Sequence, residues 1–156
     1  MEEMEGASMA SVTSFKVGGE YFGFDTTKIR HILEMTEPTK VPLSKEYMLG
    51  IINNHGNMIP VVDFRAMLGL STDEKLPETS IVVVAVENGA GAGESYLGFK
   101  VDEVDEVFDY TKEQYEPGVV VEVTRLVQRS LNATLHIGDK FIYMVNLEEL
   151  AKVVEE

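Results

Sequence analysis

The sequence predicts a mainly β protein made of two similar small β-barrels with a pseudo-twofold relation, accompanied by short helices and a C-terminal helix. Segments of strand length recur along the chain, with turn signals closely spaced between them. Two stretches resemble each other in the same order, which indicates an internal repeat. Each half of the 156-residue chain is short for an independent fold, so we expect the two barrels to share one core.

The first half is expected to open with a β-hairpin. Residues 14–17 alternate polar and apolar side chains, Gly18-Gly19 is a two-residue turn signal, and residues 22–24 resume the alternation. Asp25 or Thr26 can then cap a short helix. The apolar positions of that helix, at spacings of three and four, are Ile29, Ile32 and Leu33.

The middle of the chain predicts a second hairpin, a short helix and a buried strand. The hairpin covers residues 50–62 and turns at residues 55–57. Asp63 is placed to cap a helix of residues 64–68. The continuous apolar run of residues 81–86 has the length of a strand, and we expect it to be buried on both faces.

The second half contains more strand signals and two capping signals. Thr111 and Gln114 have the spacing of a capping box for one helical turn. Asn146 is placed to cap the C-terminal helix. Further strand-like segments are expected at residues 96–101, 119–123, 126–127, 134–137 and 141–145.

The internal repeat rests on two matches that keep the same order. Five residues recur 75 positions later: Tyr21, Gly23, Phe24, Ile29 and Ile32 match Tyr96, Gly98, Phe99, Val104 and Val107. At an offset of 82 to 83, the turn, strand and Asx-capped helix of residues 56–64 match residues 138–147. The two matches favour duplicated barrels over a chance similarity of short hairpins.

Composition excludes several classes of partner. The chain has 27 acidic and 13 basic residues and a formal net charge of -14, so a nucleic-acid or anionic membrane surface is not expected. It has no cysteine, which excludes disulfides and cysteine-based zinc sites. The longest aliphatic run is residues 81–86, far below the ~20 residues that cross a bilayer. With no signal peptide either, we expect a cytoplasmic protein without membrane insertion.

Catalytic and cofactor motifs are missing, so a non-catalytic binding module is favoured and no cofactor or metal is expected. The glycine-rich residues 89–93 lead into a strand rather than the helix that a phosphate loop needs. The three histidines lack metal-ligand spacing. Two other classes stay open: a small hydrolase using Asp63 and Asp102 as paired carboxylates, and a barrel that encloses a small molecule.

An ordered set of motifs resembles the CheW-like chemotaxis coupling proteins. The opening is Phe15-x-Val-Gly-Gly-Glu-Tyr-Phe-Gly-Phe-Asp25, followed by Ile29-x-x-Ile32 and Val41-Pro42. The strongest match is Gly50-Ile-Ile-Asn53-x-x-Gly56-x-Met-Ile-Pro60-Val-Val-Asp63-Phe-Arg65. Leu97-Gly98-Phe99-Lys100-Val101-Asp102-x-Val104 and Val145-Asn146-Leu147-Glu148-x-Leu150 complete the set. The resemblance covers about residues 14–153.

The resemblance implies two five-stranded β-barrels in one domain of residues 13–156, interleaved with an approximate boundary near residues 70–80, after an acidic tail of residues 1–12. It also implies a non-catalytic adaptor. Such proteins couple the cytoplasmic hairpin tips of methyl-accepting chemoreceptors to the regulatory domain of the histidine kinase CheA, which has the same fold. The adaptor would be cytoplasmic and recruited to membrane-associated receptor arrays.

The resemblance also assigns candidate partner-binding residues, although each apolar one could equally be plain core. An apolar groove between the barrels would be lined by Ile29, Ile32, Ile81, Val101 and Val107. The matched motifs add Gly50, His55, Gly56, Gly98 and Asp102.

One position departs from the family, whose turn usually reads Asn-Leu-Arg-Gly where this chain has Asn53-Asn54-His55-Gly56. Histidine lacks the arginine fork of donors, which leaves open an adaptor of a divergent signalling array outside chemotaxis. The charge is also uneven: residues 79–156 hold fifteen acidic and six basic side chains, against nine and seven in residues 13–78. Two unlike faces would suit an adaptor that holds two different partners.

Overall fold

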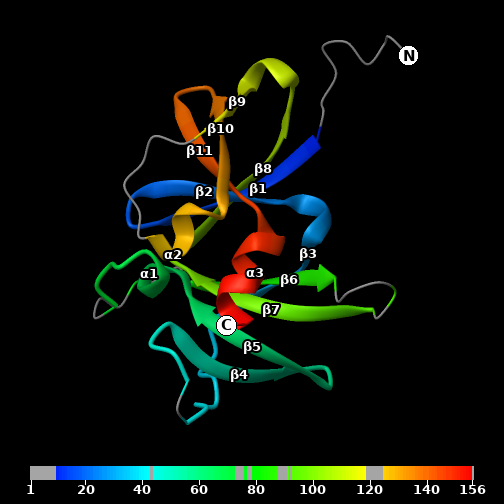
Figure 1. Cartoon of the computed structure of the whole chain (residues 1–156), viewed down its shortest axis with the longest axis vertical. Coiled ribbons are helices and arrows are strands. Elements are labelled where there is room, and N and C mark those ends of the chain that lie inside the picture. Colours follow the sequence, from blue (N-terminus) through cyan, green and yellow to red (C-terminus); the bar gives the residue numbers. More distant parts are fainter. Residues whose placement is uncertain are drawn as a thin grey trace.

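The computed structural model describes residues 10–42, 44–72, 76, 79–87, 91, 93–118 and 125–155. Their strands form two sheets, stacked along the long axis of the molecule (Figure 1). The six-stranded sheet has the order β8 (Glu103–Tyr110), β1 (Ala10–Val17), β2 (Glu20–Asp25), β11 (Lys140–Val145), β10 (Leu131–Ile137) and β9 (Tyr115–Pro117). The five-stranded sheet has the order β3 (Ile29–Glu34), β6 (Ser80–Glu87), β7 (Glu94–Val101), β5 (Asn57–Asp63) and β4 (Met48–Asn54).

Short helices connect or flank these strands. The 3-10 turns are η2 (Thr26–Lys28) and η3 (Lys112–Gln114), and the α-helices are α1 (Phe64–Met67), α2 (Arg125–Gln128) and α3 (Leu147–Glu155). The mainly β fold class with its C-terminal helix is confirmed. The six-stranded sheet has one strand more than the expected five, because the short strand β9 extends it beside β10.

The two sheets exchange strands along the chain. The chain crosses to the five-stranded sheet after β2 and returns to the six-stranded sheet after β7. In the first half, β1 and β2 pair in the six-stranded sheet and β3 to β5 in the five-stranded sheet. In the second half, β6 and β7 pair in the five-stranded sheet and β8 to β11 in the six-stranded sheet. This exchange explains why the halves cannot separate without breaking both sheets.

The pairing registers reproduce the sequence repeat. Strand β2 pairs in parallel with β11 at Gly23↔Met144, and β7 pairs in parallel with β5 at Gly98↔Val61. The glycines differ by 75 positions and their partners by 83, as the two sequence matches do. The outer pairs β1–β8 and β6–β3 also correspond, and each contains a register shift characteristic of a β-bulge.

Each sheet curls around its own apolar cluster, and a larger cluster lies between the sheets. The six-stranded sheet encloses Val12, Tyr110, Ala133, Leu135, Ile142 and Met144. The five-stranded sheet encloses Ile52, Ile59, Val61, Ile81 and Val83. The members of the first cluster come from β1, β8, β10 and β11, which only a curled sheet can bring together.

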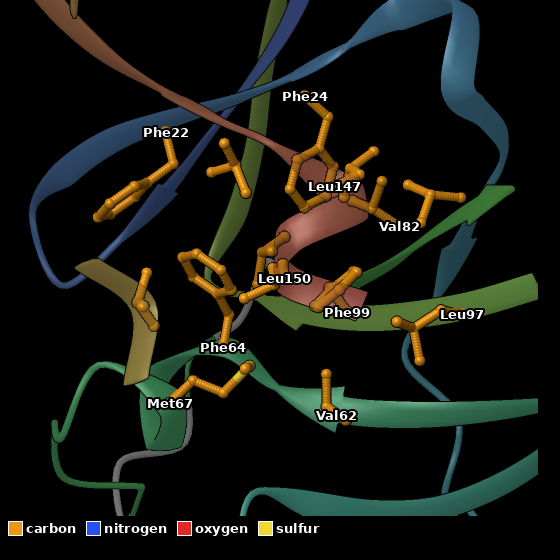
Figure 2. Packing of buried hydrophobic residues seen from close by; sticks show 14 of the residues in the cluster. Phe22, Phe24, Val62, Phe64, Met67, Val82, Leu97, Phe99, Leu147 and Leu150 are labelled. Atoms are coloured by element: carbon orange, nitrogen blue, oxygen red, sulfur yellow. The ribbon is translucent and has the colours of Figure 1, made fainter. Parts of the chain in front are cut away.

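The shared core is rich in phenylalanine and is closed by α3. Figure 2 shows Phe22 and Phe24 of the six-stranded sheet above Phe64 and Phe99, with Leu150 between them. The ring centroids of Phe22 and Phe64 are 5.2 Å apart, and those of Phe24 and Phe99 are 5.3 Å apart. All five side chains are at most 1 % exposed, which confirms the expectation of one core shared by both barrels.

Most local predictions are confirmed. The hairpins at residues 14–24, 50–62 and 134–145, the strands at 81–86 and 96–101, and the caps at Asp63 and Asn146 all form. Thr111 and Gln114 form the capping box. Strand β1 begins at Ala10, earlier than the end of the tail expected from the sequence.

Two local predictions were wrong, and one lies outside the described residues. Residues 26–33 do not form a helix: only Thr26–Lys28 turn, and Ile29–Glu34 pair with β6 as strand β3. The expected strand at residues 126–127 is the helix α2. The expected strand at residues 119–123 falls outside the part of the chain that the structure describes.

Candidate partner-binding surface

Two of the ten residues assigned by resemblance are exposed aliphatic side chains on sheet edges. Ile32 on β3 is 48 % exposed and Val107 on β8 is 60 % exposed. Strands β3 and β8 each pair with a single neighbour, so each is the edge of its sheet. The two residues occupy equivalent places in the repeat, opposite Val82 and Thr13 respectively. Exposed aliphatic residues on unpaired edges are accessible to a partner.

The other expected groove residues lie deeper. Ile81 is 0 % exposed inside the five-stranded barrel, and Val101 is 1 % exposed in the shared core. Ile29 is half-buried and packs against the shared core. Ile81 and Val101 offer no surface to a partner while the fold is intact, so their side chains act as core. Of the five expected groove-lining side chains, Ile32, Val107 and in part Ile29 are accessible at the surface; their role in partner binding stays a prediction.

His55 and Gly56 form the tight turn between β4 and β5. Their φ angles are +54° and +87°, the pattern of a type I′ hairpin turn. Asn53 Oδ1 accepts a hydrogen bond from the Gly56 amide at 2.9 Å. Among the described residues only His55 combines a positive φ with a side chain, a conformation that Asn, Asp and Gly adopt more readily. The exposed imidazole therefore projects from the hairpin tip at some conformational cost.

Gly50 and Gly98 have structural reasons to be glycine. At Gly50, with φ +144°, a Cβ would lie 2.2 Å from the carbonyl oxygen of Thr39. That carbonyl belongs to a segment that bridges to β4 at Ile51. At Gly98 a Cβ would lie 3.0 Å from Ile81 Cγ2 and 3.3 Å from Val61 Cγ2. Both glycines are buried, so they shape the fold and present no side chain to a partner.

Asp102 is occupied by contacts inside the protein. It lies between β7 and β8, where the chain returns to the six-stranded sheet. Its Oδ2 accepts hydrogen bonds from Arg65 Nη1 at 2.6 Å and from the Gly18 amide at 2.8 Å. Arg65 Nε also donates to the Ser71 carbonyl at 2.8 Å. Since the side chains of Arg65 and Asp102 are only 13 % and 16 % exposed, this pair ties α1 to the β1–β2 turn rather than reaching outward.

The other sheet crossing, between β2 and β3, has a comparable ion pair with the charges reversed. Lys28, in the turn between β2 and β3, lies 3.5 Å from Glu148 in the first turn of α3. In the pair described above the acid lies at the crossing and the base on the helix. The β7–β8 crossing is thus joined to α1, which follows β5, and the β2–β3 crossing is joined to α3, which follows β11.

The two alternative functions lose their structural basis. Asp63 is 3 % exposed, and its Oδ1 accepts hydrogen bonds from the amides of Arg65 and Ala66 at 3.0 and 3.4 Å. It acts as a helix cap, so it does not make a catalytic pair with Asp102. The barrel interiors are filled by the apolar clusters described above. Within the described part of the chain no group of three or more His, Asp or Glu side chains could hold a metal ion.

Sequence reasoning missed a second pair of exposed apolar residues. Met58 on β5 is 64 % exposed and Phe141 on β11 is 54 % exposed. They are 83 positions apart, so they are equivalent in the repeat, and each follows the turn of its hairpin. The repeat offset of 83 could have identified them, since both lie at the start of strands that the sequence predicted in corresponding hairpins.

The surface also has a polar pocket and an apolar depression. The apolar depression lies beside Met58 and is lined by Met48, Pro60, Tyr96, Leu97 and Val154. The smaller polar pocket, of about 240 Å³, is lined by Asp25, Lys28, Tyr110 and Tyr115 among others. Burial and the nearby Asp25 carboxylate raise the pKa of the Tyr110 hydroxyl above 10.0.

No helix in the described residues is both long enough and apolar enough to cross a bilayer.

Comparisons with known proteins agree with this geometry. The family model of the CheW-like domain matches residues 11–155. A chemotaxis protein CheW of Thermotoga maritima is 30% identical over 145 residues, covering 93% of this chain and 87% of that protein. A chemotaxis protein CheW of Klebsiella aerogenes is 30% identical over 139 residues, covering 87% and 78%. The crystal structure of the scaffolding protein TtCheW from Thermoanaerobacter tengcongensis superposes with a TM-score of 0.78 at 25% identity, covering 90% and 91%.

Proposed function

The chain belongs to the CheW-like domain family, and we propose that it couples the cytoplasmic hairpin tips of methyl-accepting chemoreceptors to the regulatory domain of the histidine kinase CheA. It is a non-catalytic scaffold of chemotaxis-type signalling. One observation supports the assignment of separate partner surfaces: four of the six exposed large hydrophobic residues in the described part of the chain form two repeat-related pairs, Ile32 with Val107 and Met58 with Phe141.

The edge-strand pair is our candidate for the receptor surface. A helical hairpin docks through aliphatic side chains on a shallow apolar surface. Ile32 and Val107 supply exposed aliphatic groups, and the half-buried Ile29 and Val104 lie at the start of the same two strands. Strand β8 adds the exposed carboxylates of Glu103 and Glu106, so a basic residue beside the apolar contact would strengthen binding.

The tip of the β4–β5 hairpin, with Met58 and His55, is our candidate for the kinase surface. The regulatory domain of CheA, as a barrel of the same fold, would present its own hairpin ends to this adaptor. Met58 is exposed beside this turn and His55 lies at its tip. The β10–β11 turn, which Phe141 follows, lies at the opposite end of the molecule (Figure 1). The imidazole stands where the family turn usually has arginine, so we expect the kinase surface facing it to lack the carboxylate that an arginine would pair with.

Charge substitutions on each pair test the two assignments against one another. Val107→Asp or Ile32→Asp should weaken binding of a chemoreceptor cytoplasmic fragment by more than about tenfold, as expected for burying a charge in an apolar contact. Both should leave binding of CheA intact. Met58→Asp should do the reverse, so each variant is the folded control for the other.

Calorimetry or surface plasmon resonance with the receptor and kinase encoded in the same genome gives both constants. Wild-type protein that binds neither partner would refute the proposed coupling. Ile29 is unsuitable for this test because its side chain packs against the shared core, so charging it would also disturb the fold.

A further inference from the structure

A lysine beside the β10–β11 turn reaches the bulged edge strand β8. Lys140 Nζ lies 2.8 Å from Asp105 Oδ2 and 3.8 Å from Glu106 Oε1. The ammonium also lies over two aromatic rings, 4.7 Å from the centroid of Tyr21 and 5.3 Å from that of Phe108. The hydrogen bond to Asp105 raises the pKa of Lys140 above 10.5. Lys140 therefore links β11, β2 and β8 at one end of the six-stranded barrel.

The acid that Lys140 holds lies in the β-bulge. The register between β1 and β8 shifts between Thr13 and Phe15, where the two residues Asp105 and Glu106 lie opposite the single residue Ser14. A bulge leaves backbone groups without their regular ladder partners. The fully buried Ser14 replaces part of that ladder: its hydroxyl donates to Asp105 Oδ2 at 2.9 Å, and the Glu106 amide lies 3.2 Å from its Oγ. The bulge is thus held by Ser14 from inside and by Lys140 from the hairpin.

The equivalent bulge on β3 is held in a similar way with opposite charges. Arg30 is 75 positions before Asp105, and the register between β3 and β6 shifts there. Arg30 Nη2 lies 3.0 Å from Glu94 Oε2 on β7, and its Nη1 donates to the Thr27 carbonyl at 2.8 Å. The exposed aliphatic residue lies two positions after the ion-paired residue of the bulge in both strands: Ile32 after Arg30 and Val107 after Asp105. A bulge redirects the side chains that follow it, so fixing the bulge also fixes that residue.

We propose that Lys140 is a positioning residue for partner binding: by holding the bulge at Asp105 and Glu106, it keeps Val107 directed outward on β8. This inference rests on the proposed receptor surface. Lys140 itself would not touch the partner. Its effect would be transmitted through the register of β8, where Val107 lies opposite Thr13.

Three variants separate positioning from direct contact and from general stability. Lys140→Met keeps an unbranched stem over the two rings but removes the charge. Lys140→Arg keeps the charge and can donate to Asp105, so it is the conservative rescue. Lys152→Met is the matched control, because Lys152 makes an exposed ion pair with Glu149 on α3.

Amide hydrogen exchange on the isolated protein reports how firmly Lys140 holds the bulge of β8, without any partner. Lys140→Met should speed exchange of residues 103–110 about tenfold, the scale of a local opening, and leave the β4–β5 hairpin unchanged. It should weaken binding of a chemoreceptor cytoplasmic fragment severalfold. Lys140→Arg and Lys152→Met should keep both properties near wild type.

The other outcomes would overturn the proposal in distinguishable ways. Unchanged exchange in Lys140→Met, or a rise spread equally over both sheets, would show that Lys140 does not hold β8 specifically. Faster β8 exchange with unchanged receptor binding would refute the positioning role. If Val107→Asp also left receptor binding unchanged, the receptor surface itself would be wrong and the positioning role would fall with it.

Discussion

Replacing Gly50 by alanine should strongly destabilise the fold without touching any exposed surface. The φ of +144° lies in a region that side-chain-bearing residues rarely adopt, with a cost of about 1–3 kcal/mol. The added Cβ would lie 2.2 Å from Thr39 O, 2.6 Å from Thr39 C and 3.1 Å from Lys40 N. All three are backbone atoms, so no side-chain rotation can relieve the clash.

The neighbouring segment must then move away from β4. It is held there by two hydrogen bonds, from the Thr39 amide to the Ile51 carbonyl at 2.9 Å and from the Ile51 amide to the Thr39 carbonyl at 2.8 Å. A hydrogen bond of this kind stabilises a protein by about 1 kcal/mol. Together the strained backbone and the two lost hydrogen bonds predict a loss of about 3–5 kcal/mol, a large part of the stability of a typical domain.

Gly19→Ala provides the matched control. Gly19 has φ +86°, and a Cβ there would meet no atom within 4 Å, so only the cost of a positive φ remains, about 1–2 kcal/mol. Urea unfolding measures the free energy of unfolding of both variants, and an unchanged m-value shows that the shift is one of stability. The reasoning would be refuted if the two substitutions cost the same. A Gly50→Ala protein of wild-type stability that failed to bind a partner would instead make Gly50 a contact residue.

Three further results are expected. Arg65→Met should lower the free energy of unfolding by about 1–3 kcal/mol, since it leaves the Asp102 carboxylate without its guanidinium. An unchanged urea midpoint would show that the Arg65–Asp102 pair does not stabilise the fold. Burial raises the pKa of Tyr110 and Tyr143 above 10.0, so unfolded tyrosines lose their protons first and stability should fall as pH rises past about 10. Tyr110→Phe should flatten that fall in a pH series of thermal melts. His55→Asn should stabilise the turn by up to about 1 kcal/mol while weakening kinase binding, and a gain in both would remove His55 from the contact surface.

The hairpins, the helix caps and the repeat could be predicted from the sequence because they depend on local signals. Glycine pairs mark the first hairpin, Asp63 and Asn146 mark the helix starts, and the offsets of 75 and 83 align the two sheets. Residues 26–33 were assigned wrongly since Ile29 and Ile32 fit both a helix spacing and a bulged strand. Only pairing with β6, a non-local contact, selects the strand.

The partner surface was harder to predict because sequence alone does not separate core from exposed aliphatic residues. Val101 and Val107 were both assigned to the groove, yet Val101 is 1 % exposed in the shared core and Val107 is 60 % exposed on an edge. The roles of Gly50 and Lys140 depend on segments that are distant in sequence, the first on Thr39 and the second on Asp105. Such contacts leave no local pattern to read.

Co-sedimentation of CheA with receptor-containing membranes is the most direct test of the proposed coupling. CheA and membranes carrying the chemoreceptor would be mixed with and without this protein, and the kinase in the pellet measured. We expect CheA to pellet with the membranes mainly when this protein is present, and Val107→Asp and Met58→Asp each to abolish the effect. If CheA pelleted equally without the protein, or if both variants retained full recruitment, the proposed coupling through these two surfaces would be contradicted.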